Sequence, residues 1–442
     1  MLSYLHAFHA GNHADILKHA ALIQLIKKLN QKNAPYSFFD THAGSGLYST
    51  QGEKARKTGE AARGVLALAD FAAKEAAQDR EVSQDLNGGG PNSGLATDTG
   101  SSLRSGANQE VSQDLNGGGP NSGLATDTGS SLKSGADQEA SQDLNGGGQQ
   151  ETDESQRSGG ALPAALADYL AFVRPYLARD LYPGSPLIER AFLRADSAHT
   201  ICELHPQEFE ALKENCARNF GLNSAFGPGQ EAAATSLGLA DNTGSRPKSA
   251  ATNAGPSAVP HTQILKADGF KTLLAQTPPK IKRGAALIDP SYEEAADYEA
   301  VKKTVIAVHK KWSAGIIMVW YPLLAHRAAE IENMIESTIA AAKIQNANTN
   351  ILRAEFCVDT AQSHTEMTLK ENAAAKAAAA GMSNALGLAT EPSTSNAPRL
   401  YGSGILVINA PWKLDQELDA ALKYLSRVPG LASVPSYSVT LG

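Results

Sequence analysis

The feature of this chain that most restricts its fold is an alternation of short apolar runs with longer amphipathic stretches. The amphipathic stretches, such as Pro206–Phe220, Asp297–Lys311 and His326–Ile344, have apolar residues at helical spacing. Strands that alternate with helices fold into a mostly parallel sheet with covered faces. The sequence therefore predicts an α/β protein, with strands expected at Tyr36–Phe39, Thr200–Leu204, Gln263–Leu265, Ala285–Ile288, Gly315–Trp320, Ile351–Val358 and Gly404–Ile408.

A tandem repeat interrupts this pattern. The stretch "EVSQDLNGGGPNSGLATDTGSSLRSGANQ" begins at Glu81, recurs from Glu110 and starts a third time at Glu139. Its few apolar residues cannot compensate for the entropy lost on ordering, so we expect disorder. Two further low-complexity inserts lie near residues 222–260 and 373–398. All three are interpreted as expansions of surface loops, which tolerate insertion.

The domain organisation follows from these inserts. We expect residues 1–50 to form an N-terminal segment and the first part of the core. Residues 51–77 and 160–198 are expected to form a small helical insertion subdomain. The repeat occupies 78–159, and residues 199–442 complete the core.

Charge and cysteine content limit the possible partners. The net charge is −7, but residues 78–158 alone contribute −9, which leaves the rest at +2 and permits an RNA partner. The cysteines, Cys202, Cys216 and Cys357, form no CxxC pair. No signal-peptide pattern or membrane-length apolar run occurs. We expect a soluble, cytoplasmic, monomeric protein.

Four histidines near the N-terminus, His6, His9, His13 and His19, raise the question of a metal site. Their spacing matches no zinc pattern and no cysteine or carboxylate cluster joins them, so no bound metal is expected. Asn12 is instead typical of an N-cap for a helix that runs to about residue 29.

One end of the predicted sheet has the features of a cofactor site. In "SFFDTHAGSG" a strand is followed by Asp40 and by the glycines Gly44 and Gly46, which allow a tight turn and close ligand approach. The third glycine of a dinucleotide fingerprint is missing. A nucleoside cofactor without a pyrophosphate, such as S-adenosylmethionine, would not need it. An ordinary strand-to-loop turn is the alternative.

Two more acids follow strands. Glu203 in "TICELHP" is suited to accept hydrogen bonds from ribose hydroxyls, and Asp268 with Gly269 in "ILKADGF" could hold an adenine amino group. Each acid alone could be a helix cap. Together with Asp40, these are three acids at three strand ends, and this pattern favours a binding site.

The stretch "ALIDPSYEE" ends a buried strand with Asp289, Pro290, Ser291 and Tyr292. An adenine amino nitrogen is a poor nucleophile, and two hydrogen-bond acceptors can activate it. The Asp289 carboxylate and the Pro290 carbonyl are candidates for these acceptors. Tyr292 could stack on an extruded base. A plain turn is the alternative, because Asp and Pro are common turn residues.

Together these phrases resemble a known family. "HAFHAGNHADILKH", "DTHAGSG", "YPGSP", "ELHP", "KADGF", "LIDPSYE", "WYP" and "VINAPWKL" occur in family order and resemble the bacterial RlmJ family, whose members methylate an adenine of 23S ribosomal RNA. The resemblance covers the chain outside the three inserts. One departure is Ser291, which stands where the family motif has a second proline.

The resemblance implies a Rossmann-like class I methyltransferase fold with a mostly parallel, seven-stranded sheet. It implies N6 methylation of adenine 2030 of 23S rRNA, on protein-free or early assembly particles, with S-adenosyl-L-methionine as methyl donor. Asp289, Pro290 and Tyr292 would be catalytic, and Tyr4, His6 and Lys18 would face the RNA. The cofactor ligands would be His19, His42, Ser185, Glu203, Asp268 and Gly269.

Three alternatives remain open from the residues alone. The same kind of motif can activate a glutamine amide in a protein. It can also serve a DNA adenine-N6 methyltransferase, although no separate target-recognition domain is evident. A non-catalytic nucleotide-binding module is the third alternative, and the joint presence of Asp289, Pro290 and Tyr292 disfavours it.

Overall fold

The computed structural model describes residues 6–87, 161–218, 260–363, 365–366 and 400–442. The chain divides into two units, one of Met1–Arg80 with Gly160–Gly442 and one of Glu81–Gly159. The first unit contains the fold described below. Most of the repeat, nearly all of the two further inserts and Tyr4 lie outside the described residues, so the expectations about them stay predictions.

The core of the first unit is a sheet of eight strands in the order β10-β8-β9-β7-β6-β1-β4-β5. The five strands from β7 to β5 are parallel, whereas β9, β8 and β10 pair antiparallel to their neighbours. The strands are β1 Ser37–Asp40, β4 Ala198–Cys202, β5 His261–Leu265, β6 Gly284–Ile288, β7 Ile316–Leu323, β8 Ile351–Cys357, β9 Gly402–Ile408 and β10 Ser436–Leu441.

The α/β class and the mostly parallel sheet are confirmed, but the expected count of seven strands is wrong. The eighth strand is β10, an edge strand that pairs with β8 from Ser436 to Leu441. Its residues are partly or fully exposed. Because half of this short strand is Ser or Thr, it lacks the apolar run that identified the others.

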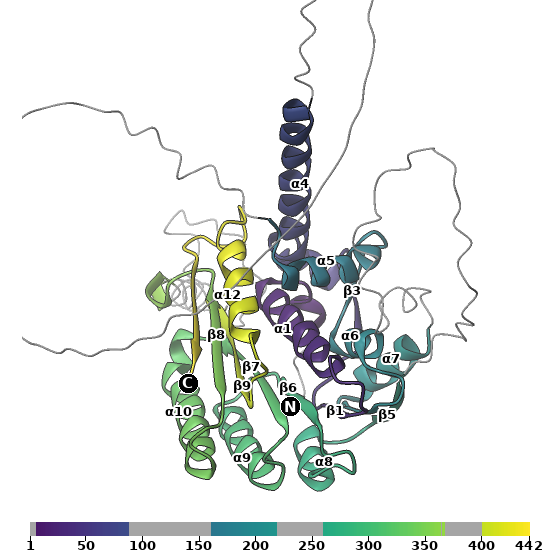
Figure 1. Cartoon of the computed structure of the whole chain (residues 1–442), viewed down its shortest axis with the longest axis vertical. Helices are drawn as coiled ribbons and strands as arrows, with labels where there is room; N and C mark the ends of the chain where they lie inside the picture. The colour runs from purple at the N-terminus through teal and green to yellow at the C-terminus, as the bar shows by residue number, and fades with distance from the viewer. Residues whose placement is uncertain (1–5, 88–160, 219–259, 364, 367–399) are drawn as a thin grey trace, which may run out of the picture. The chain divides into compact units, whose positions relative to one another are not determined.

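Helices cover both faces of the sheet, because alternate strand residues point to opposite sides. In β6, Ala285 and Leu287 belong to one apolar cluster, and Ala286 and Ile288 belong to a second. The first face is covered by α1 His13–Asn30, α5 Ala164–Leu177, α6 Ser185–Phe192 and α12 Leu414–Leu425. The second is covered by α8 Gly269–Gln276, α9 Ala295–Lys311 and α10 Ala328–Gln345, which lie side by side (Figure 1).

The segment 160–198, which was expected to belong to a helical insertion subdomain, contains α5 and α6 with the strand β3, Leu181–Pro183, between them. This strand pairs antiparallel with β2, Leu47–Ser49, in a small second sheet. Further helices are α2 Glu53–Thr58, α3 Glu60–Arg63, α4 Val65–Asn87 and α7 Pro206–Ala217.

Helix α1 begins as predicted, with the Asn12 side chain accepting a hydrogen bond from the backbone N–H of Asp15 at 3.0 Å. The helix is buried on nearly every side, Lys18 and His19 included. The polar side chains of a helix that is buried on all sides need hydrogen-bond or ionic partners. Those of Lys18 and His19 have their partners at the site described next.

The N-terminal segment that precedes α1 is braced by α2 and α3. The Thr58 hydroxyl donates to the Phe8 carbonyl at 2.5 Å, and His9 Nδ1 lies 2.9 Å from a Glu60 carboxylate oxygen. The second Glu60 oxygen accepts from the Asn12 side chain at 2.9 Å. These contacts hold η1, His6–Phe8, next to the start of α1.

Candidate functional site

A cavity of about 560 Å³ lies at the carboxyl edge of the parallel strands. Four of these strands bring an acid to this edge, because the registers of β1 with β4 and β6 align the strand ends. Asp40 is the last residue of β1, and the acids that follow β4, β5 and β6 are Glu203, Asp268 and Asp289. Asp289, Glu203 and Asp268 line the cavity. The volume is typical of a site for a small organic ligand. The acids identified from the sequence thus lie at one edge of the sheet, and their role as a binding site stays a prediction.

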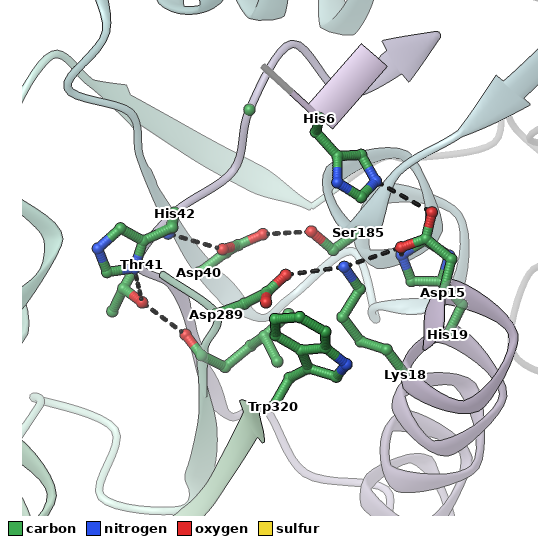
Figure 2. A network of polar contacts seen from close by, with 12 residues as sticks. His6, Asp15, Lys18, His19, Asp40, Thr41, His42, Ser185, Asp289 and Trp320 are labelled. Atoms are coloured by element: carbon green, nitrogen blue, oxygen red, sulfur yellow. Dashed lines mark hydrogen bonds and ion pairs between the residues drawn. The ribbon is translucent and has the colours of Figure 1, made fainter. Parts of the chain in front are cut away.

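We call the part of the cavity lined by Asp15, Lys18, Asp289 and Trp320 the substrate half, after the role predicted for Lys18 and Asp289. It is built around Lys18. The Lys18 ammonium contacts Asp289 Oδ2 at 2.8 Å and Asp15 Oδ1 at 3.0 Å, and it lies 5.5 Å from the centre of the Trp320 ring (Figure 2). Only 5% of Lys18 is exposed. Helix α1 and strands β6 and β7 therefore meet at one buried ammonium group.

The second oxygen of Asp15 joins this cluster to the N-terminal segment. Asp15 Oδ2 lies 3.0 Å from His6 Nε2 and accepts a hydrogen bond from the backbone N–H of Gly11 at 2.8 Å. Figure 2 shows His6 and Lys18 at different oxygens of the Asp15 carboxylate. His6 and Lys18, two residues expected to face the RNA, are thus brought together by an acid that the sequence did not single out.

In the substrate half, burial and nearby charges shift the pKa values of the ionisable groups in opposite directions. Burial raises the pKa of Asp289, although the nearby Lys18 lowers it. For Asp15, burial also works to raise the pKa, but its electrostatic interactions with His6 and Lys18 outweigh burial and hold the pKa well below its usual range. Burial would lower the pKa of Lys18, but the carboxylates of Asp15 and Asp289 outweigh this effect and raise its pKa. Lys18 is therefore a fixed positive charge.

Tyr292 takes an unusual backbone conformation. Its φ of 52° is rare for an aromatic residue, and its ring is buried, with 4% of the residue exposed. The hydroxyl donates to the Trp320 carbonyl at 2.7 Å, and the ring centre lies 4.7 Å from that of Tyr298. Tyr292 lines the cavity together with Pro290. Its role as a stacking platform stays a prediction.

The opposite part of the cavity, which we call the cofactor half after the role predicted for its residues, is lined by His42 and Ser185, and both contact the buried Asp40. The Ser185 hydroxyl donates to Asp40 Oδ2 at 2.7 Å, and the backbone N–H of His42 donates to Asp40 Oδ1 at 3.1 Å. Burial raises the pKa of Asp40 to about 7 and lowers the pKa of His42 to about 4. His42 is therefore a neutral ring at physiological pH, suited to hydrogen bonding and stacking.

Glu203 and Asp268 are tied to backbone amides. Glu203 accepts from the N–H of Gly44 at 2.7 Å and from that of His205 at 2.6 Å. Asp268 caps α8 by accepting from the N–H of Lys271 at 3.1 Å. For Asp268 the cap predicted as the alternative is real, and because the residue also lines the cavity, this does not remove it from the candidate site.

Gly269 is required by close packing. A Cβ atom there would lie 2.0 Å from the carbonyl oxygen of Thr41, which is a backbone atom and cannot turn away. The glycine thus lets the N-terminus of α8 approach the end of β1. This approach places Asp268 beside His42, whose ring packs edge-on against Phe270 at 4.7 Å.

His19 is the most deeply placed of the predicted ligands, and 1% of it is exposed. Its Nδ1 lies 2.8 Å from the Tyr182 hydroxyl, whereas its Nε2 has no hydrogen-bond partner among the described residues. Burial lowers its pKa to about 3, so the ring is neutral. The second nitrogen lies 4.0 Å from Asp15 Oδ1, and His19 also lines the cavity.

Sequence reasoning missed Asp15 and Trp320. Asp15 is an acid in the first turn of a helix, which the sequence presents as an ordinary contribution to helix stability. Trp320 belongs to the "WYP" phrase that entered the family resemblance, and no role was given to it. Within the described ranges, no group of three or more His, Cys, Asp or Glu residues could hold a metal ion, and no helix is long and apolar enough to cross a bilayer.

Known proteins resemble this chain over nearly its whole length. It is 25% identical to the ribosomal RNA large subunit methyltransferase J of Escherichia coli, over 96% of this chain and 93% of that protein. It is 23% identical to the protein of the same name from Haemophilus influenzae, over 97% and 94%.

The fold is also found in a solved structure. The crystal structure of protein LPL1258 from Legionella pneumophila superposes with a TM-score of 0.53, at 19% identity and 98% coverage of both chains. The model of the family described as "Ribosomal RNA large subunit methyltransferase D, RlmJ" matches residues 33–93, 146–242 and 257–375. The chain therefore belongs to the RlmJ family of ribosomal RNA large subunit methyltransferases and has its Rossmann-like, class I methyltransferase fold.

Proposed function

We propose that this protein transfers a methyl group from S-adenosylmethionine to the N6 amino group of an adenine in 23S ribosomal RNA, in the bacterial cytoplasm. The motif resemblance described in the sequence implies adenine 2030 as the target. The observation that carries the proposal is the position of Asp289. Its carboxylate ends a parallel strand and lines the same cavity as the cofactor half.

The residues of the cofactor half fit S-adenosylmethionine. Glu203 presents a carboxylate suited to ribose hydroxyls, and Asp268 beside the neutral ring of His42 suits an adenine amino group and ring. The unpartnered Nε2 of His19 offers a polar contact deep in the cavity. Ser185 adds a hydroxyl at the start of α6. When bound, this cofactor supplies an electrophilic methyl group.

Asp289 and Pro290 then activate the target nitrogen. Lys18 engages Oδ2 of Asp289 and leaves Oδ1 for one amino hydrogen, while the Pro290 carbonyl accepts the other. Two accepted hydrogen bonds would localise the lone pair on the nitrogen. The nitrogen would form the new N–C bond as the bond between the methyl carbon and sulfur breaks, which leaves S-adenosylhomocysteine. The proton that the nitrogen then loses passes to Asp289 or to water. The remaining contribution is alignment of the reacting atoms.

His6 and Lys18 provide the RNA side of the site, and Tyr4 is proposed to join them. The two described residues contact Asp15 and line the cavity that an extruded base would enter. A base must leave its stack to reach Asp289, because the carboxylate lies inside the cavity. Trp320 and Tyr292 provide aromatic surface beside it.

Mass spectrometry of nucleosides from the native host tests the proposal. Deleting the gene should abolish N6-methyladenosine at one position of 23S rRNA. The wild-type gene should restore it, and a gene encoding Asp289→Asn should not. Unchanged rRNA in the deletion strain would overturn the proposal. A methyl group lost from a glutamine of a protein, or from DNA adenine, would identify the alternative substrate.

A further inference from the structure

We propose that Asp15 is a positioning residue that retains the Lys18 ammonium when the substrate's amino group engages Asp289. The inference rests on the proposed function, and it assigns a role to an acid that does not touch the reacting atoms. The observation behind it is that one buried lysine is shared by two carboxylates, at 3.0 Å from Asp15 and 2.8 Å from Asp289.

Asp15 itself is fixed in place. The N–H of Gly11 and the ring of His6 contact its Oδ2 at 2.8 and 3.0 Å, and 1% of the residue is exposed. The carboxylate belongs to the first turn of α1, one turn before Lys18. Rotation of Asp15 away from Lys18 would break both of these contacts, so Asp15 is the stationary partner.

Asp289 has a second task, because the target nitrogen must hydrogen-bond to it. Whenever a substrate amino group draws the Asp289 carboxylate, the contact between Asp289 and Lys18 weakens. A buried ammonium without a partner is strongly unfavourable. With Asp15 present, Lys18 keeps a full carboxylate partner on one side and the Trp320 ring on the other. Asp15 thereby allows Asp289 to exchange partners.

Without the charge of Asp15, Lys18 would depend on Asp289 alone. The lysine would then compete with the substrate amino group for the same carboxylate. We expect Asp15→Asn to lower the single-turnover rate at saturating RNA and cofactor by roughly 10- to 100-fold, the scale of one hydrogen bond to a charged group. Cofactor affinity should change less than the rate, because the Asp15 carboxylate contacts Lys18, His6 and the Gly11 N–H at 2.8–3.0 Å, whereas the predicted cofactor ligand His19 lies 4.0 Å away.

A double-mutant cycle with Lys18→Met tests whether Asp15 acts on the rate through Lys18 or only stabilises the fold. If Asp15 acts through Lys18, Asp15→Asn should cost less than about twofold in the Lys18→Met background. An equal cost in both backgrounds would overturn the inference, as would a wild-type rate for Asp15→Asn alone. The matched control is Asp168→Asn. Asp168 pairs at 2.6 Å with Lys27, another lysine of α1, and should not affect the rate.

A second cycle needs no RNA and therefore separates this inference from the proposed function. Either Asp15 or Asp289 alone gives Lys18 a partner, so Asp15→Asn and Asp289→Asn should each fold. The double variant leaves the ammonium unpaired. Its melting temperature should fall by roughly 5 °C or more beyond the sum of the single losses. Additive losses would overturn the inference even if the wild type methylates rRNA. A wild type that methylates no RNA, with synergistic losses, would overturn only the proposed function.

Discussion

The two halves of the cavity hold their carboxylates in different ways. In the cofactor half, Glu203 and Asp268 accept hydrogen bonds from backbone amides, several of them in their own loops. In the substrate half, Asp289 depends on a side chain that is 271 residues away in the sequence. In the first arrangement the His205 and Lys271 amides are local to their acids, and only the Gly44 amide, 159 residues before Glu203, is distant. The second exists only when α1 has docked against the sheet.

This difference has an energetic consequence. Backbone amides are neutral donors, so the cofactor half can lose one acid and keep the others in place. The substrate half is a coupled set of charges, and removal of one changes the surroundings of the rest. The effects of mutations should therefore be additive in the cofactor half and non-additive in the substrate half.

The largest effect is expected from Asp289→Asn. The substitution removes the charge that draws the amino hydrogens, so methyl transfer should slow by a factor on the order of 100 or more. Affinity for S-adenosylmethionine should stay within about threefold, because the loss occurs in the transition state. Single-turnover assays and calorimetry measure the two quantities. A near-normal rate would show that "DPSY" is only a turn.

Glu203→Ala should produce the converse result. Loss of a charged acceptor should weaken cofactor binding by roughly 5- to 150-fold, and leave the rate at saturating cofactor within a few fold. Glu210→Ala is the control, because Glu210 lies on the following helix and pairs with Lys213 at the surface. Unchanged affinity in calorimetry would leave Glu203 with the role of an anchor for the Gly44 and His205 amides.

Gly269→Ala tests the packing that brings the two strand ends together. The added Cβ meets the Thr41 carbonyl, so α8 must shift, at a cost of about 1–3 kcal/mol of folding stability. Cofactor affinity should fall with it. Gly52→Ala, where the nearest atom is a Ser49 side-chain carbon at 3.3 Å, should cost less. Chemical denaturation compares them, and equal losses would argue against the close approach.

The smallest effect concerns His9 and pH. Burial of His9 works against its charge, but the hydrogen bond and charge of Glu60 prevail and raise its pKa above 6.5. A raised pKa stabilises the fold fully below about pH 6.5, and this contribution disappears as pH rises through the folded-state value. His9→Gln should therefore lower stability by at most about 1 kcal/mol near pH 6, and by almost nothing near pH 9. A constant difference across this range would exclude the ion pair.

The same contrast explains how much the sequence predicted. Asp289, Glu203 and Asp268 were identified because each follows an apolar run, and chains of parallel strands align such positions at one edge. Seven strands were found for the same reason. The predicted cap at Asn12 is confirmed because capping involves only neighbouring residues.

What the sequence did not reveal depends on distant contacts. Asp15 is indistinguishable from a first-turn helix acid until Lys18 and Asp289 are seen beside it. The inward turn of the Tyr292 ring follows from a positive φ, which the letters "DPSY" do not encode. Strand β10 forms only because β8 offers it an edge, and its own residues have little apolar character.

The distance of 271 residues between Lys18 and Asp289 also has a meaning in time. At about 5–20 residues per second, a ribosome needs roughly 15–55 s to reach Asp289 after it has added Lys18. Asp15, three residues earlier, is already present when Lys18 is made. The nascent chain thus has one counter-charge for its lysine from the beginning, and the pair of Lys18 and Asp289 is completed only after most of the protein has been synthesised.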